Sequence, residues 1–239
     1  MGLIEDALNG WSKKEIVWIF SCIVIAVVSG YITDSSFLII AYSIVGITNL
    51  ILIAKGKIFN YIPGLIGGVM YAIISYQNDV YGQFLLAILF LCPIQFYGWY
   101  NWTRPVNNTE QNQIKIKKLA LFMRIKLILL ITVLSSLYGY FILNLYFGQS
   151  VGLFADSIVT ITSVVAFILT VLIYREHWVL WLTIDILTIS IWVSGILDYS
   201  ITIAIIPVVI TKLVALINAT YGFMKWRAMY NLQTNPENT

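Results

Sequence analysis

The feature that most constrains this chain is a series of apolar runs, each long enough to cross a lipid bilayer. A spanning helix needs about 20 largely apolar residues, and here 60% of the 239 residues are hydrophobic and only 10% are charged. Soluble globular domains do not have this composition. The sequence predicts an all-α membrane protein with eight transmembrane helices, at residues 16–32, 36–54, 58–77, 80–102, 121–147, 152–174, 178–196 and 200–226.

The basic residues predict how these helices are oriented. With eight crossings, every loop that carries Lys or Arg falls on one side, and the opposite loops carry only the acids Asp34, Asp79 and Asp198. Basic loops face the cytoplasm, so we expect both termini there. These residues suit topology and lipid headgroups better than nucleic acid. The basic side comprises Lys13, Lys14, Lys55, Lys57, Arg104, Lys115, Lys117, Lys118, Arg175 and Arg227.

Two short patterns recur and predict a duplication. Tyr-Gly-x3-Trp occurs at 97–102 and 221–226, and Asp-Ser occurs at 34–35 and 156–157. The number of residues between the two copies is almost the same for both patterns. Such coincidences also arise by chance in aromatic-rich membrane sequences. Because four crossings separate the copies, the repeats should be parallel, a geometry that transporters use. The expected organisation is an N-terminal segment with one helix (1–33), a three-helix repeat (34–102), a cytoplasmic loop and linker helix (103–150), a second three-helix repeat (151–227) and a cytoplasmic tail (228–239).

Polar residues inside the apolar runs predict a ligand site. Trp178, Trp181 and Asp185 share one helical face, and Asp185 lies about 10 Å beyond Trp178 along the axis. A charged group at that depth costs at least about 2.5 kcal/mol and needs a partner or a ligand. Gln95 and Asn218 are expected at the same depth, although interhelical hydrogen bonding is the alternative reading. Aromatic walls with these groups suit a planar, heteroaromatic and positively charged ligand.

Other polar residues have less defined expected roles. Asn60 is expected to line the inner half of the path. Asp156, Lys212 and Tyr221 are candidates for a gate or an ion pair, with Lys212 pairing either Asp156 or Asp185 or contacting a substrate hydroxyl. His177 is expected to be solvated at the inner mouth. The two cysteines, both inside apolar runs, indicate neither a disulfide nor a metal site, and no cofactor is expected.

The chain resembles the PnuC family of bacterial vitamin transporters in three features. These are the Trp-x2-Trp-x3-Asp pattern at 178–185, the two Tyr-Gly-x3-Trp motifs, and the order of three helices, one linker helix and three helices. The resemblance implies a fold like that of SWEET sugar transporters, a homotrimer in the cytoplasmic membrane, and facilitated diffusion of nicotinamide riboside, which a cytoplasmic kinase then traps as its phosphate. It also implies that Trp178, Trp181 and Asp185 contact the ligand, with Gln95 and Asn218 as hydrogen-bonding partners. Lys212 departs from the family pattern.

Alternatives remain open at this stage. Relatives of this family are thought to carry thiamine, riboflavin or deoxynucleosides, and an ion-coupled transporter is also compatible with the residues. An enzyme would need paired catalytic groups, which one histidine and scattered acids do not supply. A receptor would bind the ligand without transporting it. No G-x4-G-K-[ST] loop is present, so hydrolysis of ATP by this chain is not expected.

Overall fold

The computed structural model describes residues 7, 9–77, 87–107, 114–144, 153–197 and 206–234. The regular elements in these residues are helices, and β-structure is limited to isolated bridge residues at Ile114, Lys117 and Tyr174. The prediction of an all-α fold is therefore confirmed for the part of the chain that is described. The chain divides into two compact units, residues 1–115 with 224–239 and residues 116–223, and each unit is described by itself below.

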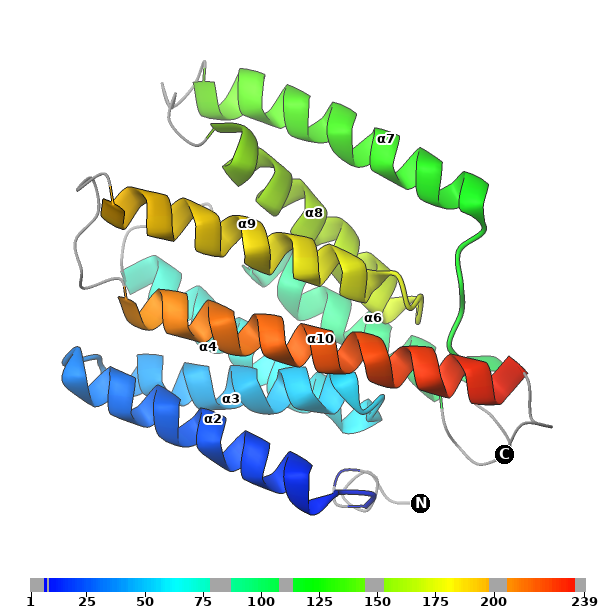
Figure 1. Cartoon of the computed structure of the whole chain (residues 1–239), viewed down its shortest axis with the longest axis horizontal. Helices are drawn as coiled ribbons and strands as arrows, with labels where there is room; N and C mark the ends of the chain where they lie inside the picture. Colours follow the sequence, from blue (N-terminus) through cyan, green and yellow to red (C-terminus); the bar gives the residue numbers. More distant parts are fainter. Residues whose placement is uncertain are drawn as a thin grey trace. The chain divides into compact units, whose positions relative to one another are not determined.

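The first unit packs consecutive helices against one another, α2 on α3, α3 on α4 and α4 on α6 (Figure 1). A π-helical turn, η2, leads into α6, where Pro93 occupies one of the first two positions. Proline lacks a backbone N–H, and it stands here at the junction between the π-helical turn and α6. The elements are α2 (Lys13–Ile32), α3 (Phe37–Ala54), η1 (Ile58–Asn60), α4 (Tyr61–Gln77), η2 (Ala87–Leu91), α6 (Cys92–Thr103) and η3 (Pro105–Asn107).

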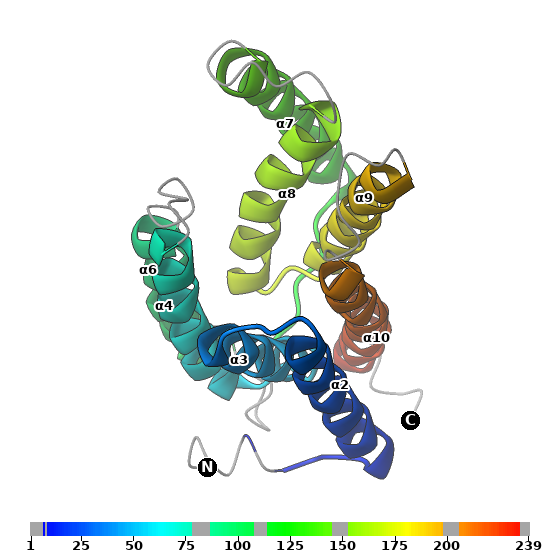
Figure 2. The ribbon, with the colours of Figure 1, turned by 90° about the vertical axis from the view of Figure 1, so that its left-hand side faces the viewer.

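The second unit contains α7, α8, α9 and the first part of α10, and α8 packs against both α7 and α9. α9 and the first part of α10 lie side by side and run in opposite directions in both ribbon views (Figures 1 and 2). α10 is continuous to Thr234, eight residues beyond the predicted end of its span, so residues 228–234 are helical. The elements are α7 (Leu121–Leu137), η4 (Tyr138–Asn144), α8 (Leu153–Val171), α9 (His177–Leu197) and α10 (Ile206–Thr234).

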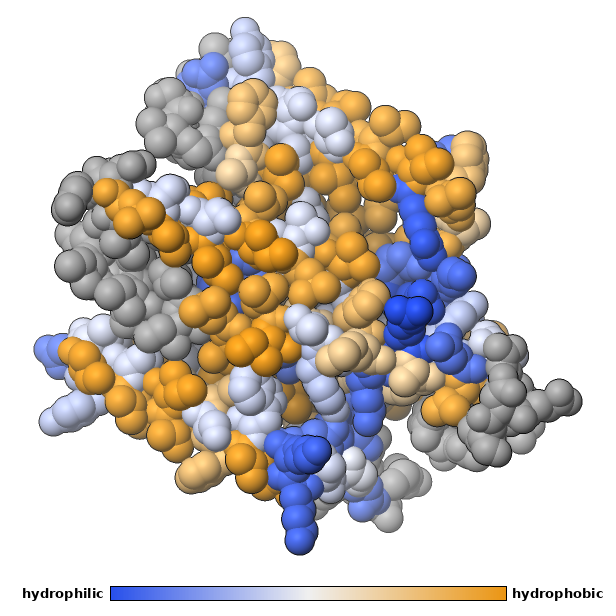
Figure 3. All heavy atoms as spheres, in the orientation of Figure 1, coloured by the Kyte–Doolittle hydropathy of each residue, from blue (hydrophilic) through white to orange (hydrophobic). Residues whose placement is uncertain are grey.

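The surface of these helices is that of a protein immersed in lipid. Among the described residues, three helical stretches are long and apolar enough to cross a membrane, Lys13–Ile32, Phe37–Ala54 and Leu121–Phe141. Only 6% of the last of these is buried within the protein, and apolar residues predominate on the visible face of α7 and α9 (Figure 3). Apolar surface on this scale is unfavourable in water and favourable in the bilayer. Shorter apolar helices cover Ile58–Ile74, Ser157–Val171 and His177–Ile191.

One helix ending occurs twice, after α3 in the first unit and after α8 in the second. Each is a Schellman turn, in which the second residue after the helix is left-handed and two backbone hydrogen bonds close over the last turn. The left-handed residue is Gly56 (φ 67°) in the first case and Ile173 (φ 65°) in the second. The bonds are Gly56 N–H to Ile53 O (2.9 Å) and Lys57 N–H to Leu52 O (2.9 Å), and Ile173 N–H to Thr170 O (3.1 Å) and Tyr174 N–H to Leu169 O (3.0 Å).

The next helix begins in the same way in both units. Asn60 donates its side-chain amide to the carbonyl of Lys57 at 2.6 Å, and Nδ1 of His177 lies 2.7 Å from the carbonyl of Tyr174. Both side chains are fully buried, with exposed fractions of 1% and 0%. His177 is thus not the solvated residue that the sequence analysis expected, because its ring is committed to closing the turn.

Both copies of the Tyr-Gly-x3-Trp motif use their glycine in the same way. Gly98 on α6 receives the ring of Tyr61, the first residue of α4, and Gly222 on α10 receives the ring of Trp178, near the start of α9. A side chain at either glycine would collide with that ring. The Asp-Ser pattern is different, since Asp34 lies in a turn before α3 and Asp156 lies inside α8. These two acids do not occupy equivalent positions.

The segment immediately before α7, residues 114–120, is extended and partly buried. Ile114 and Ile116 are buried, with 1% and 6% exposed, in the alternating pattern of an extended strand. Within the second unit, the N–H of Lys117 donates to the carbonyl of Ile173 at 2.9 Å, and the carbonyl of Lys117 accepts from Arg175 at 3.0 Å. This pairing holds Ile173 in a left-handed conformation that is rare for a β-branched residue.

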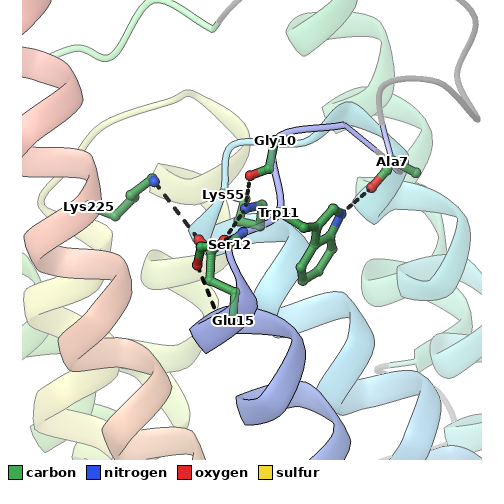
Figure 4. Close-up of polar contacts among 7 residues, drawn as sticks. All are labelled: Ala7, Gly10, Trp11, Ser12, Glu15, Lys55 and Lys225. Atoms are coloured by element: carbon green, nitrogen blue, oxygen red, sulfur yellow. Dashed lines mark hydrogen bonds and ion pairs between the residues drawn. The ribbon is translucent and has the colours of Figure 1, made fainter.

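A buried ion pair fixes the start of α2 within the first unit (Figure 4). Glu15 completes a capping box with Ser12 and pairs with Lys55, whose Nζ lies 2.8 Å from Oε2. Lys55 also donates to the carbonyl of Gly10 at 2.7 Å, and Lys225 lies 3.9 Å from the other oxygen of Glu15. The side chain of Lys55 is only 3% exposed, and burial lowers its pKa against the opposing effect of Glu15. The C-cap of α3 and the C-terminal part of α10 are thereby joined to the start of α2.

Candidate substrate site

The predicted aromatic and acidic face lies on α9, which runs without interruption from His177 to Leu197. Trp178 and Asp185 are buried, with exposed fractions of 1% and 4%, and Trp181 is partly buried. Their spacing of three and seven residues places the three side chains on one side of the helix. All three belong to the second unit, as do their contacts described below.

Trp178 forms the closed end of this face. Its ring occupies the space left by Gly222 on α10, and its centroid lies 4.6 Å from that of His177. Because His177 is itself held by the carbonyl of Tyr174, the indole has little freedom to move. Trp178 therefore packs inside the unit and sets the spacing between α9 and α10 at this level.

Trp181 sits against α8 and is the less enclosed of the two indoles. Its ring meets Phe167 edge to face, with centroids 4.9 Å apart and an interplanar angle of 89°. Its Nε1 donates to the hydroxyl of Thr170 at the long distance of 3.5 Å. The edge-to-face arrangement is a favoured geometry for two aromatic rings, and here it involves a single aromatic neighbour of Trp181. Trp181 is consequently oriented by α8 while part of its surface is left uncovered.

Asp185 has a cationic neighbour on α10. Lys212 Nζ lies 4.0 Å from Oδ1 of Asp185, and the two side chains are 35% and 5% exposed, respectively. The distance is at the outer limit of an ion pair. Of the partners that the sequence analysis considered for Lys212, the structure brings Asp185 near it. The side chain of Asp156 lies outside the described residues.

Asn218 is a buried side chain whose hydrogen-bonding groups are unused. It is 2% exposed, and within the described part of the chain neither Nδ2 nor Oδ1 has a hydrogen-bond partner. Leaving a buried polar group unpaired costs about 1–3 kcal/mol, so each such group calls for an explanation. The position of Asn218 along α10 shows which residues of α9 lie near its level.

Two contacts define how α10 is aligned along α9. Gly222 contacts Trp178, and Lys212 lies near Asp185. Asn218 lies four residues before Gly222, which is about 6 Å along the helix, and therefore falls between these two contacts. It also lies on nearly the same face as Gly222, since four residues are slightly more than one turn. The amide of Asn218 is thus at the level between the closed end of the site and its carboxylate.

The other candidate residues lie elsewhere or are only partly described. Gln95 on α6 packs in the first unit against Gly64, which also has Asn49 beside it. The amide of Asn60 is used within its own turn, and Tyr221 is partly buried on α10. The second unit therefore brings together Trp178, Trp181, Asp185, Asn218 and Lys212, and the roles predicted for Gln95, Asn60 and Tyr221 stay predictions.

Sequence reasoning missed three contributors to this arrangement. Phe167 and Thr170 orient Trp181, but only the pairing of α8 with α9 reveals that contact. Gly222 was recognised as part of a repeated motif, yet its role in receiving Trp178 was not. A glycine inside an otherwise large-residue membrane helix is a signal of close packing, and this signal could have identified it.

Comparison with known proteins gives the class to which this arrangement belongs. A protein called Nicotinamide riboside transporter PnuC, from Neisseria mucosa, is 30% identical over 225 residues, covering 93% of this chain and 84% of that protein. The protein of the same name from Haemophilus influenzae is 30% identical over 225 residues and 94% of each chain. A solved structure, the crystal structure of the Vitamin B3 transporter PnuC, is 28% identical with a TM-score of 0.77, covering 95% of this chain and 96% of the other.

These similarities, together with the apolar helices, define a multi-pass membrane protein of a transporter class. The sequence profile described as Nicotinamide mononucleotide transporter matches residues 36–228. This chain belongs to that family, the PnuC family, as its tryptophan motif indicated. The profile covers both Tyr-Gly-x3-Trp motifs and all of the site residues described above.

Proposed function

We propose that this protein carries nicotinamide riboside across the bacterial cytoplasmic membrane. The observation that carries the proposal is the unpaired amide of Asn218, at the level between Trp178 and the buried carboxylate of Asp185. Nicotinamide riboside has a flat pyridinium ring, a carboxamide and ribose hydroxyls. A carboxamide can exchange two hydrogen bonds with Asn218, because each amide offers a donor and an acceptor.

Each residue of the site has a distinct role in this proposal. Trp181 stacks on the ligand ring, since part of its surface is uncovered, and Trp178 forms the packed wall behind it. Asp185 compensates the positive charge of the pyridinium, and cation–π attraction to the indole adds to it. Gln95 is proposed as a further hydrogen-bonding partner of the ligand, Asn60 as a residue of the inner half of the path, and Tyr221 and Asp156 as residues of a gate or an ion pair.

The test is calorimetric binding of a ligand panel to purified protein, with nicotinamide riboside, nicotinamide mononucleotide, thiamine, riboflavin and a deoxynucleoside. We expect nicotinamide riboside to bind, and Trp181→Ala to weaken binding roughly tenfold to a hundredfold, the usual effect of losing a stacked aromatic worth about 1–3 kcal/mol. Asp185→Asn should weaken it less. Trp18→Ala, which removes an indole from α2, is the matched control. Unchanged affinity in both site variants would place the ligand elsewhere.

The remaining features of the proposal concern mechanism and assembly. Transport is proposed to be passive, with accumulation supplied by a cytoplasmic kinase that phosphorylates the vitamin, and the assembly is proposed to be a homotrimer with both termini in the cytoplasm. The one-sided distribution of basic residues supports the orientation. Concentrative uptake of unmodified ligand into kinase-free vesicles, driven by a proton or sodium gradient, would contradict passive transport. Labelling of Asn9→Cys in intact cells by an impermeant thiol reagent would contradict the orientation.

We also propose that residues 34–102 and 151–227 are duplicated three-helix units. The support is local: the same Schellman turn, the same buried side chain closing the next helix, and the same glycine–aromatic contact occur in each. Three matching details in the same order are harder to reach by chance than one sequence motif. An experimental structure in which residues 51–61 and 168–178 have different backbones would refute the duplication.

A further inference from the structure

The position of Lys212 has a consequence for which ligands the site accepts. A carboxylate buried to the extent of Asp185 needs a counter-charge, because desolvation of an isolated charge costs several kcal/mol. Among the described residues, Lys212 is the cation within ion-pair distance, with Nζ 4.0 Å from Oδ1. The charge of Asp185 is therefore balanced by a residue of the protein itself.

The geometry of the pair is that of a loose contact. A distance of 4.0 Å exceeds the 2.7–2.9 Å of a charge-assisted hydrogen bond. The side chain of Lys212 is 35% exposed whereas that of Asp185 is 5% exposed, so the lysine approaches the acid from the more open side. Its four-carbon stem is flexible and its ammonium is a compact point charge. The lysine can consequently leave the acid without disturbing the packing around it.

We infer that Lys212 is a tethered cation that competes with the charged ring of the ligand for Asp185 and so sets the preference of the site between charged and uncharged ligands. This inference rests on the proposed function. When a pyridinium ring enters, its charge replaces the ammonium beside the carboxylate and Lys212 moves to its exposed side. When an uncharged ring enters, the ion pair stays in place.

Competition by a tethered group weakens the binding of a cation without weakening that of a neutral ligand of the same shape. A group held on a short flexible tether has an effective concentration in the millimolar range, and a cationic ligand must overcome it. An uncharged ligand is not affected by this competition, because its ring does not form an ion pair with Asp185. The two ligand forms therefore distinguish a competing cation from a lysine that contacts the ligand.

The experiment compares nicotinamide riboside with its reduced 1,4-dihydro form, which has the same ribose and carboxamide but no ring charge. Binding of both is measured by calorimetry on the wild type, Lys212→Met and the matched control Lys212→Arg. We expect Lys212→Met to bind nicotinamide riboside about tenfold more tightly and the dihydro form with unchanged affinity. Lys212→Arg should behave like the wild type, because it keeps the charge.

A double variant keeps the inference testable if Lys212→Met alone is unstable, since it leaves no buried charge uncompensated. In Asp185→Asn the unpaired lysine should repel the pyridinium, so binding of nicotinamide riboside falls by more than binding of the dihydro form. Adding Lys212→Met to Asp185→Asn should restore part of that loss, which a double-mutant cycle measures.

The possible results separate the two proposals. If the wild type binds neither form, the proposed function is wrong. If the wild type binds nicotinamide riboside but folded Lys212→Met binds both forms more weakly, the lysine contacts the ligand and the competing-cation inference is wrong. An unchanged affinity for nicotinamide riboside in Lys212→Met, with no restoration in the double variant, would also overturn it.

Discussion

Replacing Gly222 with alanine should damage the site through a single methyl group. An added Cβ at this position would lie 2.6 Å from Cζ3 of Trp178 and still closer to two other atoms of the ring. Real Cβ atoms essentially never approach a neighbour so closely. The indole is 1% exposed and is packed against His177 on another side. Either the ring or α10 must therefore move.

The expected magnitude follows from two opposing effects. Glycine to alanine inside a helix stabilises it by about 1 kcal/mol through helix propensity, and overpacking a filled site costs about 1–3 kcal/mol. Gly46→Ala in α3 isolates the first effect, because an added Cβ there has no neighbour within 4 Å. The difference in unfolding free energy between the two variants is then the cost of the collision with Trp178, about 1–3 kcal/mol.

The assay pairs thermal unfolding of purified protein with calorimetric binding of nicotinamide riboside. Gly222→Ala should unfold at a lower temperature than Gly46→Ala and bind about tenfold more weakly, the equivalent of about 1.4 kcal/mol. Gly98→Ala is a second control, since its Cβ would collide with Tyr61 instead and leave Trp178 in place. It should lower stability with a smaller effect on binding. If Gly222→Ala matches Gly46→Ala in both measurements, Trp178 is not held against Gly222 as described.

Two further variants test other parts of the molecule. Glu15→Gln removes the carboxylate that accompanies the 3%-exposed side chain of Lys55. Breaking a buried pair costs about 3–5 kcal/mol, so thermal unfolding should begin at a markedly lower temperature, and adding Lys55→Met should recover most of the loss; equal stability in wild type and Glu15→Gln would contradict this. Gln95→Ala should weaken binding of nicotinamide riboside severalfold in calorimetry if its amide reaches the ligand, whereas an affinity equal to that of the wild type would remove it from the site.

The features that sequence predicted well are those governed by local periodicity. For most of the helix ends that the structure describes, the apolar runs predicted the boundary to within a few residues. Helical spacing correctly placed Trp178, Trp181 and Asp185 on one side of α9. Neither result required knowledge of a partner helix. The buried carboxylate of Asp185 could be interpreted for the same reason. The free-energy cost of a charge in the membrane depends on its depth, which follows from its position along one helix.

What sequence reasoning missed depends on contacts between distant segments. Ile173 is left-handed because the backbone of Lys117 pairs across it, and no local rule predicts that conformation for isoleucine. His177 is buried because it closes a turn, which its position at a helix start did not reveal. The contact between Lys212 and Asp185 required the register of α10 against α9.

The ion pair at the start of α2 has a consequence for how related sequences vary. The family profile begins at residue 36 and so includes Lys55 but not Glu15, although Lys55 Nζ lies 2.8 Å from the carboxylate of Glu15. A lysine buried this deeply is tolerated only while its counter-charge is present. We expect relatives with lysine at this position to have an acid at the equivalent of Glu15, and relatives without that acid to have an uncharged residue in place of Lys55. The identity of one residue inside the common core would then report which kind of N-terminal helix precedes it.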